Sequence, residues 1–318
     1  MRVLFIADPL ESLKKKSDTS FAFLRECLRQ GHEVYWAIDR GVTAHSHQIS
    51  IESSQITSCE KDELPIGLSA SNRPIEDFDV VLIRKDPPFD MNYIQLCWVL
   101  SYAETKIYFM NRPSLLVRYH EKILPLEAVA HGFLQPDDII PTFFGNWEAA
   151  KRYFKQNQVE KVILKPFWGF GGSDIQLLSA QEFESKSETP ELLRDQIVQP
   201  FQKEITTGDR RVFLLDGEIL CHVVRVPKSG SIISNLAQGG SALATPLRPK
   251  EEEALLRLGK FLKFAGIHLA GADVIGEKIS EVNITSPTGI RSIEELEGHD
   301  FSREIMLFAT KNAFYGRT

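Results

Sequence analysis

Three oxygen-bearing side chains near the C-terminal end of the chain have the types and spacing of a metal site. Asp273 lies in one apolar run, residues 269–275, and Glu281 and Asn283 lie in the next, residues 278–284. If both runs are strands, Glu281 and Asn283 share a face, because alternate residues of a strand point the same way. Two carboxylates and an amide oxygen suit Mg²⁺ that is also bound by nucleotide phosphates and water. The competing interpretation is an ordinary exposed strand face.

The turn between these two strands decides whether Asp273 joins that face. A three-residue turn over residues 276–278 pairs residue 273 with residue 281, and the three oxygen donors then converge. A two-residue turn at Gly276 and Glu277 points Asp273 the opposite way. Glycine at the first turn position also suits the two-residue form, so local turn preference leaves both alternatives open.

A second candidate for phosphate chemistry is the segment Gly169-Phe170-Gly171-Gly172, which follows a strand-like run ending at Lys165. Glycines allow backbone N–H groups to approach a polyphosphate, and the lysine supplies a cation. The segment is neither a Walker sequence nor the dinucleotide-binding fingerprint, because residues 164–166 lead into a hairpin-like region rather than a helix. Considered alone, it is better explained as a turn between two strands.

Charged side chains also follow two strand-like runs near the N-terminus. Asp8 follows residues 2–7, and Arg84 and Asp86 lie at the end of residues 79–84. Open α/β sheets bind ligands at the carboxyl ends of their strands, so these residues and Ser20 are candidate substrate contacts. The alternatives are a solvated strand end for Arg84 and capping or turn roles for Asp8, Asp18 and Ser20, with helix capping favoured for Asp18.

The elements that must position these groups begin with a strand over residues 2–7, a helix over residues 18–30 and a strand over residues 32–38. This order predicts a right-handed parallel unit at the start of an open α/β sheet. Residues 40–75 are rich in serine and weakly periodic, and they predict an irregular excursion with short strands at most. A strand over residues 79–84, a helix over residues 91–104 and a strand over residues 106–110 complete this unit, with a boundary near residue 120.

Hairpins and helices replace the parallel pattern in the rest of the chain. Asp216-Gly217 lies between two apolar runs and predicts a tight hairpin, because this pair supplies the positive φ values of a two-residue turn. Pro249 opens a helix that ends before Gly266. We expect an N-terminal α/β domain over residues 1–120, followed by a different arrangement of hairpins and helices in the rest of the chain.

Composition excludes several classes of protein. The chain has 318 residues with 37 Lys and Arg against 43 Asp and Glu, so its net charge is 37 − 43 = −6 and nucleic acid is not expected as a partner. No apolar stretch approaches the roughly 20 residues of a membrane span, and the start of the chain lacks the layout of a signal sequence, so we expect a soluble, cytoplasmic protein. The four cysteines are far apart and predict reduced thiols rather than disulfides or a zinc site.

Taken together and in order, the motifs resemble those of bacterial glutathione synthetases, a family of ATP-grasp ligases. The resemblance runs nearly end to end, except for residues 40–75. It implies an α/β N-terminal domain over residues 1–120 followed by a two-part ATP-grasp fold, with a lid subdomain over residues 121–200 and a C-terminal catalytic domain over residues 201–318. The motifs that carry it are Ala7-Asp8-Pro9, Ser17-Asp18-Thr19-Ser20-Phe21, Asp86-Pro87-Pro88-Phe89-Asp90, Leu164-Lys165-Pro166, Gly169-Phe170-Gly171-Gly172, Gly208-Asp209-Arg210-Arg211-Val212, Asp216-Gly217-Glu218, Asn235-Leu236-Ala237-Gln238-Gly239-Gly240 and Glu281-Val282-Asn283-Ile284-Thr285-Ser286-Pro287-Thr288.

The resemblance implies a role for each matching residue, grouped here by ligand. The metal ligands would be Asp273, Glu281 and Asn283. The ATP-binding residues would be Lys122 and Lys165 at the phosphates, Gly169, Gly171 and Gly172 over them, Gln199, Pro200 and Phe201 along the adenine, and Asp209, with Arg211, towards the ribose. The donor would be bound by Asp8, Ser20, Arg84 and Asp86, and the acceptor end would be lined by Ser286, Pro287 and Thr288. Catalytic roles would belong to Arg225, Asn235 and Arg291.

The implied reaction joins γ-glutamylcysteine to glycine. ATP phosphorylates the donor carboxylate, and the amine of glycine displaces phosphate from the acyl phosphate, which requires Mg²⁺ or, as a substitute, Mn²⁺. Phosphoryl transfer depends on alignment and on cations rather than on a protein nucleophile. Residues 229–240 have the composition of a cover that keeps water from the acyl phosphate. The family precedent also implies a homo-oligomer.

Two residues depart from the family pattern. Ile233 stands where an arginine is usual, which would remove a bidentate clamp on a carboxylate, and Trp168 stands where a smaller polar residue is common. The departure at Ile233 keeps open a ligase for a different dipeptide or acceptor amine. A nucleotide-binding regulator without turnover would need a broken set of cations and ligands, yet these residues are all present. A hydride-transfer enzyme is disfavoured because the first βα turn, residues 8–12, contains no glycine.

Overall fold

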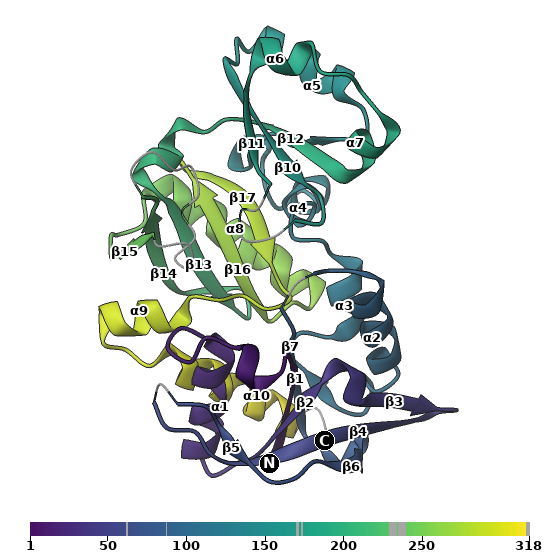
Figure 1. Cartoon of the computed structure of the whole chain (residues 1–318). Helices are drawn as coiled ribbons and strands as arrows, with labels where there is room; N and C mark the ends of the chain where they lie inside the picture. Colours follow the sequence, from purple (N-terminus) through teal and green to yellow (C-terminus); the bar gives the residue numbers. More distant parts are fainter. Residues whose placement is uncertain are drawn as a thin grey trace.

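The computed structural model describes residues 1–61, 63–86, 88–169, 172, 174–228, 234 and 240–315. Figure 1 shows an N-terminal α/β unit at the bottom, a five-stranded sheet with a long helix in the middle and a four-stranded sheet with three helices at the top. No helix in these ranges is long and apolar enough to cross a membrane. Cys27, Cys97 and Cys221 are buried, Cys59 is half-buried, and all four are free thiols.

The centre of the N-terminal unit is the predicted parallel sheet. Strands β1 (Arg2–Ala7), β2 (Glu33–Ile38), β7 (Val80–Arg84) and β8 (Tyr108–Phe109) run parallel in the order β2-β1-β7-β8. Their apolar runs are buried on both faces, as parallel strands covered by helices require. Helices α1 (Thr19–Arg29) and α2 (Met91–Ser101) connect them, and the Asp18 carboxylate caps α1 by accepting hydrogen bonds from the Ser20 and Phe21 amides.

Residues 40–75 differ from the expected irregular excursion. They form β3 (Val42–His45), β4 (Gln48–Ser58), β5 (Ile66–Gly67) and β6 (Ser71–Pro74), and β4 pairs antiparallel with β2. Ile49, Ile51 and Ile56 of β4 are buried, and serines fill many positions between them. The short strands β3, β5 and β6 were expected, but the long strand β4, which is paired on both sides, was missed because it buries few large side chains and serine outweighs its alternating apolar pattern.

The next segment leads into a separate four-stranded sheet. Helices α3 (Pro113–Arg118) and α4 (Leu124–Ala130) precede it, and its strands follow the antiparallel order β11-β10-β12-β9. Its core contains Trp147, Phe154 and Phe183 and forms a cluster of its own. The elements are β9 (Phe143–Phe144), α5 (Trp147–Gln156), β10 (Lys161–Pro166), β11 (Gln176–Ser179), α6 (Ala180–Glu184), α7 (Pro190–Asp195) and β12 (Gln196–Pro200).

The middle layer is an antiparallel sheet of order β15-β14-β13-β16-β17, covered by α8 (Pro249–Ala265). The predicted hairpin is confirmed, because Asp216 and Gly217 connect β13 and β14 with φ values of 50° and 86°. Helix α8 ends before Gly266, as predicted, and Gly266 has the left-handed conformation of a helix C-terminal cap. The strands are β13 (Asp209–Leu215), β14 (Glu218–Val226), β15 (Ser241–Leu243), β16 (Leu269–Ile275) and β17 (Lys278–Asn283).

Short 3-10 helices in the described parts of the chain are η1 (Leu10–Ser12), η2 (Asp39–Gly41), η3 (Ile75–Asp77), η4 (Pro136–Asp138) and η5 (Lys203–Thr207).

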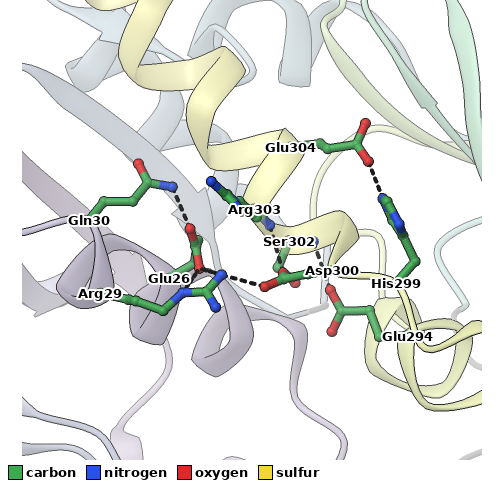
Figure 2. Close-up of polar contacts among 9 residues, drawn as sticks. All are labelled: Glu26, Arg29, Gln30, Glu294, His299, Asp300, Ser302, Arg303 and Glu304. Carbon is green, nitrogen blue, oxygen red and sulfur yellow. Dashed lines mark hydrogen bonds and ion pairs between the residues drawn. The ribbon is translucent and has the colours of Figure 1, made fainter.

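The end of the chain returns to the N-terminal unit. Helices α9 (Ile290–Glu297) and α10 (Phe301–Tyr315) lie beside α1, and Ile305 and Met306 share a buried cluster with Phe21. Figure 2 shows the polar contacts of this junction, including the ion pair between Arg29 and Asp300. The last helix therefore completes the N-terminal layer rather than the five-stranded middle sheet.

A buried asparagine fixes the middle sheet to the N-terminal unit. The side-chain oxygen of Asn111 accepts hydrogen bonds from the amides of His268 and Leu269 at 2.9 and 3.0 Å, and its amide nitrogen donates to the carbonyls of Leu269 and Ile284 at 2.6 and 2.8 Å. All four bonding positions of the side chain are used. The strands that carry Asp273 and Glu281 thus have a fixed position over the N-terminal sheet.

Candidate active site

A cavity of about 820 Å³ lies where the three layers meet. The N-terminal unit contributes Asp86, the four-stranded sheet contributes Lys165 and Gln199, and the five-stranded sheet contributes Glu281. Because each wall comes from a different layer, the cavity can hold a nucleotide and a second substrate next to each other. Its volume is in the range of small-molecule sites.

The two predicted turn alternatives are both partly right. Gly276 and Glu277 form a two-residue turn with φ values of 55° and 70°, and Ile275 pairs with Lys278. A bulge then restores the predicted pairing, because Val274 faces Ile279 while Asp273 faces Glu281, which leaves Ser280 as the extra residue. Asp273 and Glu281 therefore lie on the same face, and both line the cavity.

Two arginines surround Asp273. Arg211 Nε and Nη2 donate to its carboxylate oxygens at 2.6 and 3.0 Å, and Arg225 Nη2 lies 3.0 Å from Oδ2. Arg225 also forms a two-point ion pair with Asp209, in which Nε donates to Oδ1 at 2.9 Å. Burial alone would raise the pKa of Asp273, but the two guanidinium groups hold it below its ordinary value.

Glu281 has the opposite electrostatic environment. Burial, followed by the nearby carboxylate of Glu121, raises its pKa to about 7, although Lys122 and Lys165 act against this rise. Burial, followed by repulsion from Lys122, lowers the pKa of Lys165. Of the two paired carboxylates, Asp273 has its negative charge compensated by arginines, whereas Glu281 does not have enough positive charge around it to offset its burial.

The two predicted phosphate-binding lysines meet on one side of the cavity. Lys122 is buried, its Nζ donates to the Gly169 carbonyl at 2.7 Å, and it pairs with Glu121. Lys165 Nζ lies 3.3 Å from Ser280 Oγ. Glu121 was missed by the sequence analysis, although it directly precedes Lys122, and its carbonyl accepts a hydrogen bond from the Val282 amide at 2.9 Å.

The segment after β17 is held from several directions. Asn283 Oδ1 accepts hydrogen bonds from the amides of Thr285 and Ser286 at 3.0 and 3.2 Å. The Pro287 carbonyl accepts one from Arg84 Nη2 at 3.0 Å, and the Thr288 carbonyl accepts one from Arg211 Nη1 at 3.0 Å. Ser286 and Thr288 line the cavity, and the buried Ser286 hydroxyl has no hydrogen-bond partner within the described ranges.

The predicted donor residues do not all face the cavity. Asp86 lines it, whereas Asp8 accepts hydrogen bonds from Lys85 Nζ and the Asp86 amide, each at 2.7 Å. Ser20 Oγ accepts one from the buried Arg84 Nε at 3.2 Å, and burial lowers the pKa of Arg84. In this structure Asp8, Ser20 and Arg84 support the wall rather than line it.

The predicted adenine segment lines the cavity with Gln199, Pro200 and Phe201, and the buried Gln199 amide donates to Thr142 Oγ1 at 2.8 Å. Ile140 and Ile163 add apolar surface next to it, which suits a flat ring. Arg291 is buried but does not line the cavity, and its Nη1 donates to the Lys15 carbonyl at 2.8 Å.

Parts of the two glycine-rich segments lie outside the described residues. Gly169, Gly172 and Ser234 line the cavity. Gly171, Asn235 and Ile233 were singled out by the sequence analysis and are not among the residues that the structure describes.

Two protein-family models match the chain. The N-terminal domain of prokaryotic glutathione synthetase matches residues 1–117, and the ATP-grasp domain of the same enzyme matches residues 135–298. Solved structures share the fold at low sequence identity. D-cycloserine synthetase DcsG is 14% identical, covers 98% of this chain and 99% of its own, and has a TM-score of 0.68. The ATP-grasp ligase PsnB, solved with a precursor variant, Mg and ADP, is 16% identical, covers 98% of both chains and has a TM-score of 0.62.

Relatives with higher sequence identity are named glutathione synthetase. The protein from Nitrosomonas europaea is 32% identical over 309 residues, which are 94% of each chain. The protein from Brucella melitensis is 31% identical over 304 residues, which are 94% of this chain and 95% of the relative. The arrangement of lysines, arginines and carboxylates and these matches lead to the same conclusion: the chain belongs to the prokaryotic glutathione synthetase family and has the ATP-grasp fold of ADP-forming ligases.

Proposed function

We propose that the chain joins γ-glutamylcysteine to glycine, with ATP converted to ADP and phosphate through an acyl phosphate. The observation that carries this proposal is the pairing of Asp273 with Glu281 across one cavity wall, with Lys122 and Lys165 next to Glu281. Such a wall can bind a polyphosphate and an activated carboxylate together. Membership of the family supports the same reaction.

In this proposal the chain contributes position and charge. Lys122 and Lys165 neutralise phosphate oxygens, and Gln199, Pro200 and Phe201 hold the adenine. Because charge moves onto oxygens during phosphoryl transfer, fixed cations stabilise the transition state without proton transfer. The three-layer cavity also limits access of water to the acyl phosphate.

Arg225 and Arg211 serve the acyl side. Both line the cavity and share the Asp273 carboxylate, so their guanidinium groups are held in place when the donor carboxylate reacts. Ser286 and Thr288, which line the cavity next to these arginines, form the acceptor end in this proposal. Arg84, Asp8 and Ser20 hold these walls in place.

The family implies a divalent metal, and the Glu281 carboxylate fits one. Asp273 and Asn283 could join it only by giving up contacts that they make here, with two arginines and with two backbone amides. Glu281 has a pKa of about 7 because burial and Glu121 disfavour its charge, and a divalent cation would compensate for both. We propose that Glu281, Asn283 and Asp273 hold Mg²⁺, with Mn²⁺ as a substitute. When bound, the metal neutralises phosphate charge and bridges the nucleotide to the protein.

An ADP-release assay tests the function. We expect metal-dependent ADP release only with γ-glutamylcysteine and glycine present together, in a panel that varies one dipeptide or one amine at a time. Turnover only with another donor or amine would assign a ligase of different specificity. No turnover with any donor, combined with tight ATP binding, would favour a nucleotide-binding regulator. We also propose a homo-oligomer on the family precedent, which light scattering tests against the chain mass of 36.0 kDa.

A further inference from the structure

Four aromatic rings gather beside the cavity where three segments of the chain meet. Phe89 and Trp168 are stacked, with ring centroids 6.0 Å apart and an interplanar angle of 8°. His120 stacks on Phe167 at 4.3 Å and 17°. The His120 ring also meets Trp168 edge-on at 5.4 Å and Phe89 edge-on at 5.7 Å. We call these four residues the aromatic junction.

Three rings of the junction lie close in sequence to residues of two cavity walls. Phe89 is three residues after Asp86 in the N-terminal unit. Trp168 directly precedes Gly169, whose carbonyl accepts the Lys122 ammonium hydrogen bond. His120 is two residues before Lys122. The junction therefore joins the wall assigned to the donor to the wall assigned to the phosphates.

The exposure of Trp168 indicates that it does not serve the core. Its side chain is 48% exposed, and it belongs to none of the buried clusters of the three layers. Its ring instead contacts Phe89 and His120, which lie in other segments of the chain, and Phe167, the residue before it. Burial and the Lys122 charge lower the pKa of His120 to about 4, so the junction is uncharged at neutral pH.

We propose that the Phe89–Trp168 stack is a positioning contact that couples the donor end of the cavity to the phosphate end. The inference rests on the proposed function, because it assigns the donor to the Asp86 wall. A donor that orders the segment with Asp86 and Phe89 also orders Trp168 and Gly169, and the Gly169 carbonyl then holds Lys122 for the nucleotide. Coupling of this kind is reciprocal, so the donor strengthens nucleotide binding and the nucleotide strengthens donor binding to the same extent.

Nucleotide affinity measured with and without donor tests the coupling. The probe is a non-hydrolysable ATP analogue with Mg²⁺, titrated into the whole chain in the absence and presence of saturating γ-glutamylcysteine. We expect the donor to tighten binding of the analogue in the wild type by about two- to tenfold, the strength of one aromatic pair. Trp168→Leu and Phe89→Leu should each remove most of this gain, and Trp168→Phe should keep part of it.

The double variant and thermal melting separate coupling from damage to the fold. If the stack carries the coupling, the Phe89→Leu/Trp168→Leu variant loses no more of it than either single variant. Equal donor-induced gains in wild type and Trp168→Leu, with unchanged melting temperatures, would overturn the inference while leaving the ligase function intact. Additive losses in the double variant would also overturn it. A wild type that binds the analogue but not γ-glutamylcysteine would remove both the inference and the proposed function.

Discussion

Protonation of His120 should destabilise the folded chain over a defined range of pH. Burial, followed by the charge of Lys122, lowers the pKa of His120 from 6.5 to about 4. In the unfolded chain the imidazole recovers its ordinary pKa, so between these values the unfolded state binds a proton that the folded state does not. Stability then falls as pH decreases from 6.5 to about 4, and it is unaffected by this group above that range.

The size of this effect follows from the same difference. A gap of 6.5 − 4 = 2.5 pH units, at about 1.4 kcal/mol per unit, bounds the loss at about 3 kcal/mol. Carboxylates also titrate in this range, so the relevant quantity is the difference between wild type and a His120→Gln variant. Melting temperatures at pH 7, 6 and 5 should fall faster in the wild type than in His120→Gln. Parallel pH dependences in the two proteins would refute the reasoning, because they would show that His120 has the same pKa in the folded and unfolded states.

Two further predictions concern ion pairing and packing. Arg225→Met leaves the buried Asp209 carboxylate without its two-point partner, so it should lower the free energy of unfolding by about 3–5 kcal/mol and abolish turnover. The double variant Arg225→Met/Asp209→Asn should recover part of the stability in thermal melts but none of the turnover. Gly259→Ala should lower the melting temperature by several degrees, because the added Cβ would lie 1.9 Å from the Gly217 carbonyl oxygen. Lys260→Ala on the same helix serves as the control. An unchanged melting temperature in Gly259→Ala would show that α8 and the β13–β14 turn are not in fixed contact.

The parallel core and the hairpins could be predicted because their signals are local. Buried runs such as residues 2–7 and the Asp216-Gly217 turn specify their conformation within a few residues. The strand β4 could not be predicted, because its stability comes from pairing with β2 and with the short strands around it and not from its own serine-rich sequence. The return of α10 to the N-terminal unit depends on contacts between residues far apart in sequence, such as Phe21 and Ile305.

The site shows the same division between local and long-range information. The shared face of Glu281 and Asn283 follows from strand periodicity, whereas the position of Asp273 depends on a bulge at Ser280 that no turn preference indicates. The two arginines on Asp273 lie in other strands, and Glu121 reaches Glu281 from the segment before α4. Spacing along one strand predicts which side chains share a face, but it cannot predict their counter-ions.

The charges around the metal ligands lead to a last prediction about how ATP enters. Among the described residues that line the cavity, five cations face six carboxylates, so the wall has no net positive charge to attract a triphosphate: the cations are Lys14, Lys122, Lys165, Arg211 and Arg225, and the carboxylates are Asp18, Asp86, Glu121, Asp209, Asp273 and Glu281. Glu281 opposes phosphate binding unless a divalent cation accompanies the nucleotide.

Glu281→Gln removes this negative charge while keeping the shape of the side chain. The variant should therefore bind metal-free ATP more tightly than the wild type in the presence of a chelator, yet lose ADP release when Mg²⁺ is present. Calorimetric titration with ATP plus chelator measures the first effect, and Glu277→Gln in the adjoining turn is the matched control. Equal weakening of both metal-free and metal-bound ATP in Glu281→Gln would contradict a metal role for Glu281, because it would show that the carboxylate contacts the nucleotide itself.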